Sequence, residues 1–178
     1  EAARRGLPNL VSTVDALPHY MDPQNIAMFE KFHVYTKEEI ASRTDILLEN
    51  YSKVINIEAM TMLDMTKKKL LPTAMEYGKK ICDTAIAKKQ LGLDASAETK
   101  LAADLDSNTA KMYEAMQALE SKVNAAKEIG DVLECAKAYR SQVFSAMSDL
   151  RTYADQLEML VSAEDWPLPP YSDLLFNV

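Results

Sequence analysis

The sequence predicts an all-α protein, and two observations carry that prediction. Only Pro72 of the seven prolines falls between Gln24 and Trp166, and only three glycines do, namely Gly78, Gly92 and Gly130. Proline and glycine mark turns, so their scarcity over this stretch predicts long helices with few turns. In residues 97–129 and 131–163, moreover, apolar side chains recur at alternating steps of three and four, as in the seam of a coiled coil.

Residues 1–35 are predicted to form a connecting segment with one short helix. Pro8, Pro18 and the lack of a clean apolar period indicate an extended path over residues 1–22. Asp22 followed by Pro23 is typical of a helix start, with an N-cap and a proline at the first helical position. We therefore expect a short helix over 23–32.

A long first helix is predicted over residues 36–91. Thr36-Lys-Glu-Glu39 is a capping box, in which the threonine and the glutamate each bind a backbone N–H of the first turn. Pro72 removes one backbone hydrogen bond and is expected to kink the helix without ending it. Short turns at Gly92 and Gly130 then make the helices at about 97–129 and 131–163 antiparallel neighbours.

Helix length predicts how these three helices pack. At 1.5 Å per residue the first helix is about 80 Å long and the others about 50 Å each. Residues 36–163 are therefore expected to form an antiparallel three-helix bundle that embraces only residues 58–91. The Pro72-kinked first helix then projects over 37–57 as a stalk, and Gly130 falls near Met60.

The stretch Val54–Met65 has apolar residues on every side of its helix. A helix that packs on one side only would show a single stripe. We therefore expect coverage from more than one direction and predict interface positions at Ile57, Met60, Met62 and Met65.

Residues 164–178 are predicted to form an extended apolar tail. Three prolines in WPLPP favour an extended path, which spans roughly 40 Å over thirteen residues. Its apolar side chains are expected to dock on the bundle, another domain or another subunit. The interface positions predicted here are Trp166, Tyr171, Leu175 and Phe176.

Composition excludes several classes of partner. A net charge of −7 argues against nucleic acid, and no apolar run approaches the roughly 20 residues that span a bilayer. Two unpaired-looking cysteines suit a reducing, cytoplasmic location. The chain does not begin with methionine, so we expect a piece of a longer protein.

The sequence contains no recognisable catalytic, cofactor-binding or metal-binding motif. No histidine follows His33, which argues against the Glu-x-x-His pairs of diiron bundles. Glu58 and Asp64 lie in an apolar stretch, where they are either acid–base groups or members of ion pairs. Asn108 and Arg140 in the helix seams are either ligand-directed or structural, with the asparagine setting register and the arginine extending past the core.

Three segments together resemble the C-terminal region of type III glutamine synthetases, the large bacterial form of the ammonia-assimilating enzyme. They are EAARRGLPNL-x-STVDALP, the run ILLENYSKVINIEAMTMLDM with the following LLP, and the tail WPLPPYSDLLF. The resemblance covers essentially the whole chain, and the first and last segments are the most specific.

The resemblance implies a parent enzyme that joins glutamate and ammonia with ATP and Mg²⁺ or Mn²⁺, through γ-glutamyl phosphate. It also implies that the metal and ATP ligands lie upstream of Glu1, so no catalytic, cofactor or metal residue is carried over to this chain. The expected partners are its own catalytic domain and neighbouring subunits of a homo-oligomer, in assembly or regulation. The alternative is a stand-alone helical interaction module without enzymatic activity.

Overall fold

The computed structural model describes residues 1–169 and 171–176, and it omits the side chains of Ala3, Tyr171, Ser172 and Phe176. Helices are the only regular elements in that part of the chain, which confirms the all-α prediction. The elements are η1 (Ala3–Arg5), α1 (Thr13–Ala16), η2 (Leu17–Met21), α2 (Pro23–Lys31), α3 (Lys37–Met65), η3 (Thr66–Leu70), α4 (Leu71–Gln90), α5 (Ser96–Lys127), α6 (Val132–Ala138), η4 (Tyr139–Val143), α7 (Phe144–Glu158) and α8 (Tyr171–Phe176).

The chain divides into two compact units. The first comprises Glu1–Glu58 and Val123–Phe144, and the second comprises Ala59–Lys122 and Ser145–Val178. Each unit draws on distant parts of the sequence, because the long helices run out and back. None of the described helices combines the length and the apolar composition that crossing a bilayer requires.

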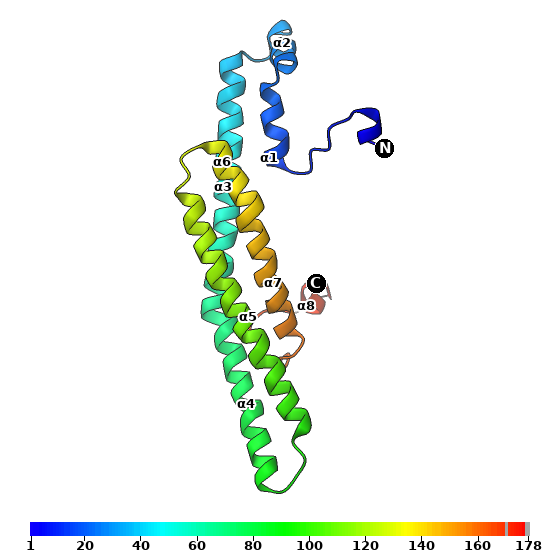
Figure 1. Cartoon of the computed structure of the whole chain (residues 1–178), viewed down its shortest axis with the longest axis vertical. Helices are drawn as coiled ribbons and strands as arrows, with labels where there is room; N and C mark the ends of the chain where they lie inside the picture. The colour runs from blue at the N-terminus through cyan, green and yellow to red at the C-terminus, as the bar shows by residue number, and fades with distance from the viewer. Residues whose placement is uncertain (170, 177–178) are drawn as a thin grey trace. The chain divides into compact units, whose positions relative to one another are not determined.

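The core of the first unit lies where α1 and α6 meet α3 (Figure 1). Val14, Leu17, Leu48 and Ala136 form one buried cluster. Leu48 lies within the predicted stalk at residues 37–57. In the structure, α1, η2 and α6 cover the helical turn around it. Gly130 lines a hollow with residues Glu49 to Asn56 of α3, one or more turns before the predicted level of Met60.

The N-terminal segment differs from its prediction, because much of residues 1–22 is helical rather than extended. Ser12 caps α1, and its Oγ accepts the Asp15 N–H at 3.2 Å and donates to Asp15 Oδ2 at 2.7 Å. Pro18 stands in the first turn of η2, where the absence of an N–H costs nothing. The helical turns are too short to show a period.

The capping box at the start of α3 has the predicted geometry. Glu39 accepts the Thr36 N–H through Oε2 at 2.8 Å, and Thr36 Oγ1 accepts the Glu39 N–H at 3.2 Å. Two backbone donors that the helix leaves without an internal partner are thereby satisfied, which fixes where α3 begins.

Pro72 does not break the first long helix. A π-helical turn, η3, stands directly before it, and the Leu71 N–H there binds the Thr66 carbonyl. A π turn contains one extra residue, so the backbone gains freedom next to the proline that cannot donate. A second π turn, η4, interrupts the third long helix at Tyr139–Val143.

In the second unit, α5 runs antiparallel to η3 and α4 (Figure 1). Lys67 Nζ lies 2.7 Å from Glu120 Oε1, and Lys88 pairs with Glu98 near the other end. These two pairs lie near opposite ends of the contact and show that the two helices run antiparallel. Five large side chains of α5 and α7 in this unit are fully buried, namely Leu105, Met112, Leu119, Leu150 and Leu157.

The tail is partly folded rather than extended. Trp166 is buried, and Asp165 next to it binds Lys80 Nζ at 2.5 Å and accepts the Ser162 hydroxyl at 3.0 Å. Residues 171–176 form the short helix α8 instead of an extended strand. No proline follows Pro170, so the last residues keep all their backbone donors.

Met112→Ala should destabilise the protein by about 2–5 kcal/mol, because it leaves a cavity at a fully buried position. Met159→Ala is the matched control, since Met159 is 85% exposed, and it should change the free energy of unfolding by less than about 0.5 kcal/mol. Urea unfolding followed by circular dichroism measures both. Equal effects of the two substitutions would contradict the assignment of Met112 to the core.

Lys80→Met should loosen the tail only at intermediate pH. The bond from Lys80 lowers the pKa of Asp165, and Asp165 raises that of Lys80. The pair therefore stabilises the tail fully above the ordinary aspartate pKa of about 3.9 and below the ordinary lysine pKa of about 10.4. It is lost as the pH falls through the lowered value or rises through the raised one.

Fluorescence of Trp166, the chain's only tryptophan, reports this pair. At pH 7 the emission of Lys80→Met should be shifted to the red of the wild type, and the difference should disappear as the pH falls through the lowered pKa of Asp165. Lys79→Met, which removes the neighbouring exposed cation, should leave emission unchanged. Identical spectra of wild type and Lys80→Met at pH 7 would show that the pair does not hold the tail.

Candidate interaction surface

The apolar stretch Val54–Met65 buries one face and exposes another. Ile55, Ala59 and Leu63 are buried at helical spacing. Of the predicted interface residues, Ile57 is 64% exposed and Met60 is 45% exposed, whereas Met62 and Met65 are half-buried. Ile57 and Met60 therefore remain largely accessible to solvent, whereas Met62 and Met65 are partly covered.

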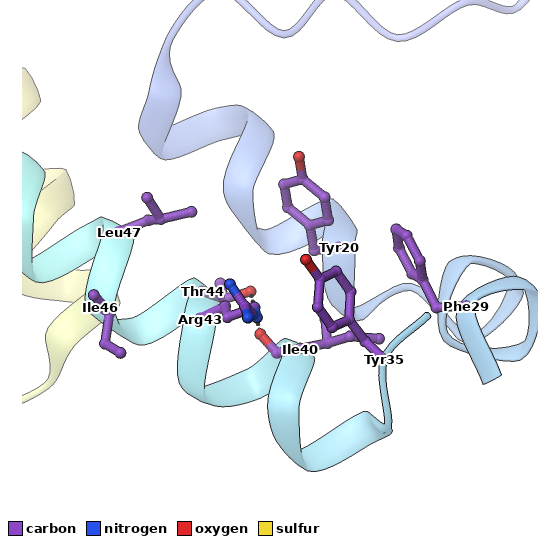
Figure 2. A pocket seen from close by; sticks show the side chains of 8 residues that line it. All are labelled: Tyr20, Phe29, Tyr35, Ile40, Arg43, Thr44, Ile46 and Leu47. Carbon is purple, nitrogen blue, oxygen red and sulfur yellow. Dashed lines mark hydrogen bonds between the residues drawn. The ribbon is translucent and has the colours of Figure 1, made fainter. Parts of the chain in front are cut away.

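A cleft of about 300 Å³ lies in the first unit beside the start of α3 (Figure 2). Side chains from η2, α2, the following loop and α3 converge on it, and most of them are aromatic or aliphatic. Its lining comprises Tyr20, Phe29, Tyr35, Ile40, Arg43, Thr44, Ile46 and Leu47.

Aromatic side chains contact one another along one side of this cleft. The Tyr20 and Phe29 rings stack with centroids 6.4 Å apart, and Phe29 meets Tyr35 at 5.8 Å. The Arg43 guanidinium lies over the Tyr35 ring at 4.5 Å from its centroid, a cation–π contact. Thr44 donates its hydroxyl to the Ile40 carbonyl at 2.9 Å, which leaves the cleft floor apolar.

This cleft was not predicted from the sequence, although the sequence contains a signal for it. Four of the chain's thirteen Phe, Tyr and Trp residues, namely Tyr20, Phe29, Phe32 and Tyr35, fall within sixteen positions. Their clustering in a segment predicted to be mainly a connection indicates a packed or binding role. Arg43 joins them two turns into α3, at a distance that no local period reveals.

A second hollow of about 290 Å³ lies where α3 meets the turn at Gly130. The Tyr139 hydroxyl donates to Asn56 Oδ1 at 3.2 Å along its edge. Burial raises the pKa of Tyr139, so the phenol stays protonated and remains a donor at neutral pH. Since Tyr139 opens the π turn η4, this bond joins the irregular turn to α3.

The four polar candidates from the sequence have local, structural surroundings. Glu58 and Asp64 are both exposed, and Asp64 pairs with Lys68 one turn along. Asn108 donates to the Asp104 carbonyl of its own helix at 3.0 Å. Arg140 lies over the Phe144 ring at 5.1 Å. Glu58 and Arg140 belong to the first unit, and Asp64 and Asn108 belong to the second.

The predicted tail contacts divide into two groups. Trp166 is covered within its own chain, and its Nε1 has no hydrogen-bond acceptor among the described residues. Leu175 is 67% exposed, as is its neighbour Leu174 at 64%. The side chains of Tyr171 and Phe176 lie outside the described part of the chain.

No three His, Cys, Asp or Glu side chains gather as a metal site in residues 1–169 and 171–176. The described residues thus do not fit the Mg²⁺ or Mn²⁺ that the resemblance implies for the parent enzyme.

Comparison with known proteins places the chain in a family. The model of the glutamine synthetase C-terminal domain matches residues 1–89. A glutamine synthetase of Butyrivibrio fibrisolvens is 38% identical over 180 residues, which cover all of this chain and 26% of that protein. A glutamine synthetase of Bacteroides fragilis is 29% identical, and a type-3 glutamine synthetase of Dictyostelium discoideum is 28% identical.

These matches run along 98–100% of the chain but along only 25–26% of the relatives. The chain therefore spans about a quarter of the length of the curated relatives it matches. Together with the domain model, this confirms the resemblance to the C-terminal region of type III enzymes: the chain belongs to the glutamine synthetase C-terminal domain family.

Proposed function

We propose that this chain is the non-catalytic assembly module of a type III glutamine synthetase, which makes glutamine from glutamate and ammonia with ATP and a divalent metal. Its partners are the enzyme's own catalytic domain and neighbouring subunits of a homo-oligomer. The observation that carries the proposal is the match of the whole chain to one quarter of full-length relatives. The catalytic machinery belongs to the remaining three quarters.

In this proposal the long helices form an antiparallel three-helix bundle, and the first half of α3 is a stalk directed at the catalytic domain. The antiparallel pairing of α4 with α5 supports the bundle. The capping box supports a sharply defined start of the stalk at Thr36. The stalk would transmit the position of one domain to the other, because a capped helix is a rigid spacer.

The exposed apolar side chains of α3 support a role in assembly. Ile46, Leu47, Val54 and Ile57 are each between 44% and 64% exposed in the first unit. Large apolar side chains repeated along one helix are typical of surfaces that another protein surface covers. We assign that coverage to the catalytic domain or a neighbouring subunit, and we include Met60 in the same role.

Ile57→Asp and Met60→Asp should separate assembly from folding. In the 178-residue chain each should change the free energy of unfolding by less than about 0.5 kcal/mol, because both side chains are exposed. In the full-length enzyme each should shift the oligomer toward smaller species in sedimentation velocity, because a buried charge is costly in an interface.

Ile86→Asp is the matched control, since Ile86 is an equally exposed residue on α4, at 54%. It should leave the oligomer intact. If Ile57→Asp and Met60→Asp also left it intact, the outer face of α3 would not be a subunit or domain interface.

The chain by itself should form no glutamine from glutamate, ammonia and ATP. Release of phosphate and formation of glutamine, measured with Mg²⁺ and then with Mn²⁺, should stay at the level of a reaction without protein. Turnover by the purified 178-residue chain would overturn the assignment of catalysis to the rest of the enzyme.

A further inference from the structure

The aromatic cleft of the first unit carries a cation without an acid to neutralise it. The Arg43 guanidinium stacks on Tyr35 and has no acidic partner among the residues that the structure describes. It is also the only basic residue between Lys37 and Lys53. The group that suits this cleft is therefore apolar and carries a single negative charge.

The C-terminal tail has this chemistry. Asp173 is the only charged side chain in residues 166–178. It precedes Leu174 and Leu175, which are 64% and 67% exposed. These two adjacent leucines lie in a six-residue helix and expose their apolar side chains to water. Burial of each side chain against another apolar surface would be favourable.

We infer that α8 of a second copy of this chain docks in the aromatic cleft, with Leu174 and Leu175 against the apolar lining and the Asp173 carboxylate against Arg43. The inference rests on the subunit contact proposed above and names its surfaces. Each copy offers one cleft and one tail, so a symmetric dimer makes the contact twice. A volume of about 300 Å³ lies at the lower end of ligand pockets, which suits a few side chains.

Charge reversal tests the inference in the 178-residue chain by sedimentation equilibrium. The wild type should self-associate, and Arg43→Glu and Asp173→Lys should each raise the apparent dimer dissociation constant by at least about tenfold. The double variant Arg43→Glu/Asp173→Lys should recover association. Lys37→Glu is the control, since it makes the same charge change on α3 outside the cleft. Circular dichroism verifies that each variant is folded.

Mixing the two single variants distinguishes exchange between copies from docking within one copy. Arg43→Glu has a negative cleft and a negative tail, and Asp173→Lys has a positive cleft and a positive tail. Each repels itself, but an equimolar mixture pairs opposite charges at both contacts and should associate like the wild type. Docking within one copy would gain nothing from mixing.

The apolar part is tested with Leu175→Asp, which should weaken association at least tenfold, against Leu93→Asp at a similarly exposed leucine of the α4–α5 turn, which should not. A wild type that stays monomeric, charge variants that associate normally, or a mixture that fails to associate would each overturn the inference. These experiments use the 178-residue chain alone, so their failure would rule out docking of α8 in the cleft but would not rule out the proposed assembly role. That role is tested separately by Ile57→Asp and Met60→Asp in the full-length enzyme.

Discussion

A single buried stripe along the first long helix is the constraint on which the rest of the structure depends. In the first unit it consists of Ile40, Thr44, Leu48, Ser52 and Ile55, and in the second of Ala59, Leu63, Thr66, Leu70 and Ala74. Within each unit the spacing is three or four, as expected for one face of a helix. The π turn at Thr66–Leu70 occurs within this run without interrupting it. Large apolar residues of α3 outside the stripe, such as Ile46, Ile57 and Met60, are exposed.

Much of the fold can be predicted from local patterns in the sequence. Scarce proline and glycine predict the long helices, and the capping box at Thr36 has the bonds that its four letters imply. The seam of the third helix is likewise evident from periodicity, since Ala136, Val143, Ala146, Leu150 and Leu157 are all buried. These features depend on neighbours within one or two helical turns, which is the range over which sequence patterns are reliable.

The misses arise where geometry depends on distant partners or on single turns. Helix length alone put Gly130 near Met60, but α1, η2 and α6 pack further back, around Leu48. The N-terminal turns are too short to show a period, although Ser12 and Asp15 form a cap that the sequence displays. The aromatic cleft needs Arg43 to come beside Tyr35, a tertiary contact. The π turns have no signature in the sequence beyond the proline that follows one of them.

Covered and uncovered surfaces have different roles in this domain. Family membership identifies the chain as a C-terminal domain, and the chain spans about a quarter of the length of its relatives. The outer face of α3, the aromatic cleft and the tail leucines are among the apolar surfaces that the described chain leaves exposed. We interpret them as places where the remainder of the enzyme and its neighbours attach. The core accounts for folding, and the exposed surfaces are where the proposed assembly contacts would form.

Thiol accessibility at Ile57→Cys tests this account most directly. The rate of modification by a soluble thiol reagent would be compared between the 178-residue chain and the assembled full-length enzyme carrying the same substitution, with the native exposed Cys82 as an internal reference. The account predicts rapid modification of the isolated chain and at least about tenfold slower modification in the assembly, because position 57 becomes buried. Equal rates at position 57 in the two samples would contradict the claim that this face of α3 is where the domain is held.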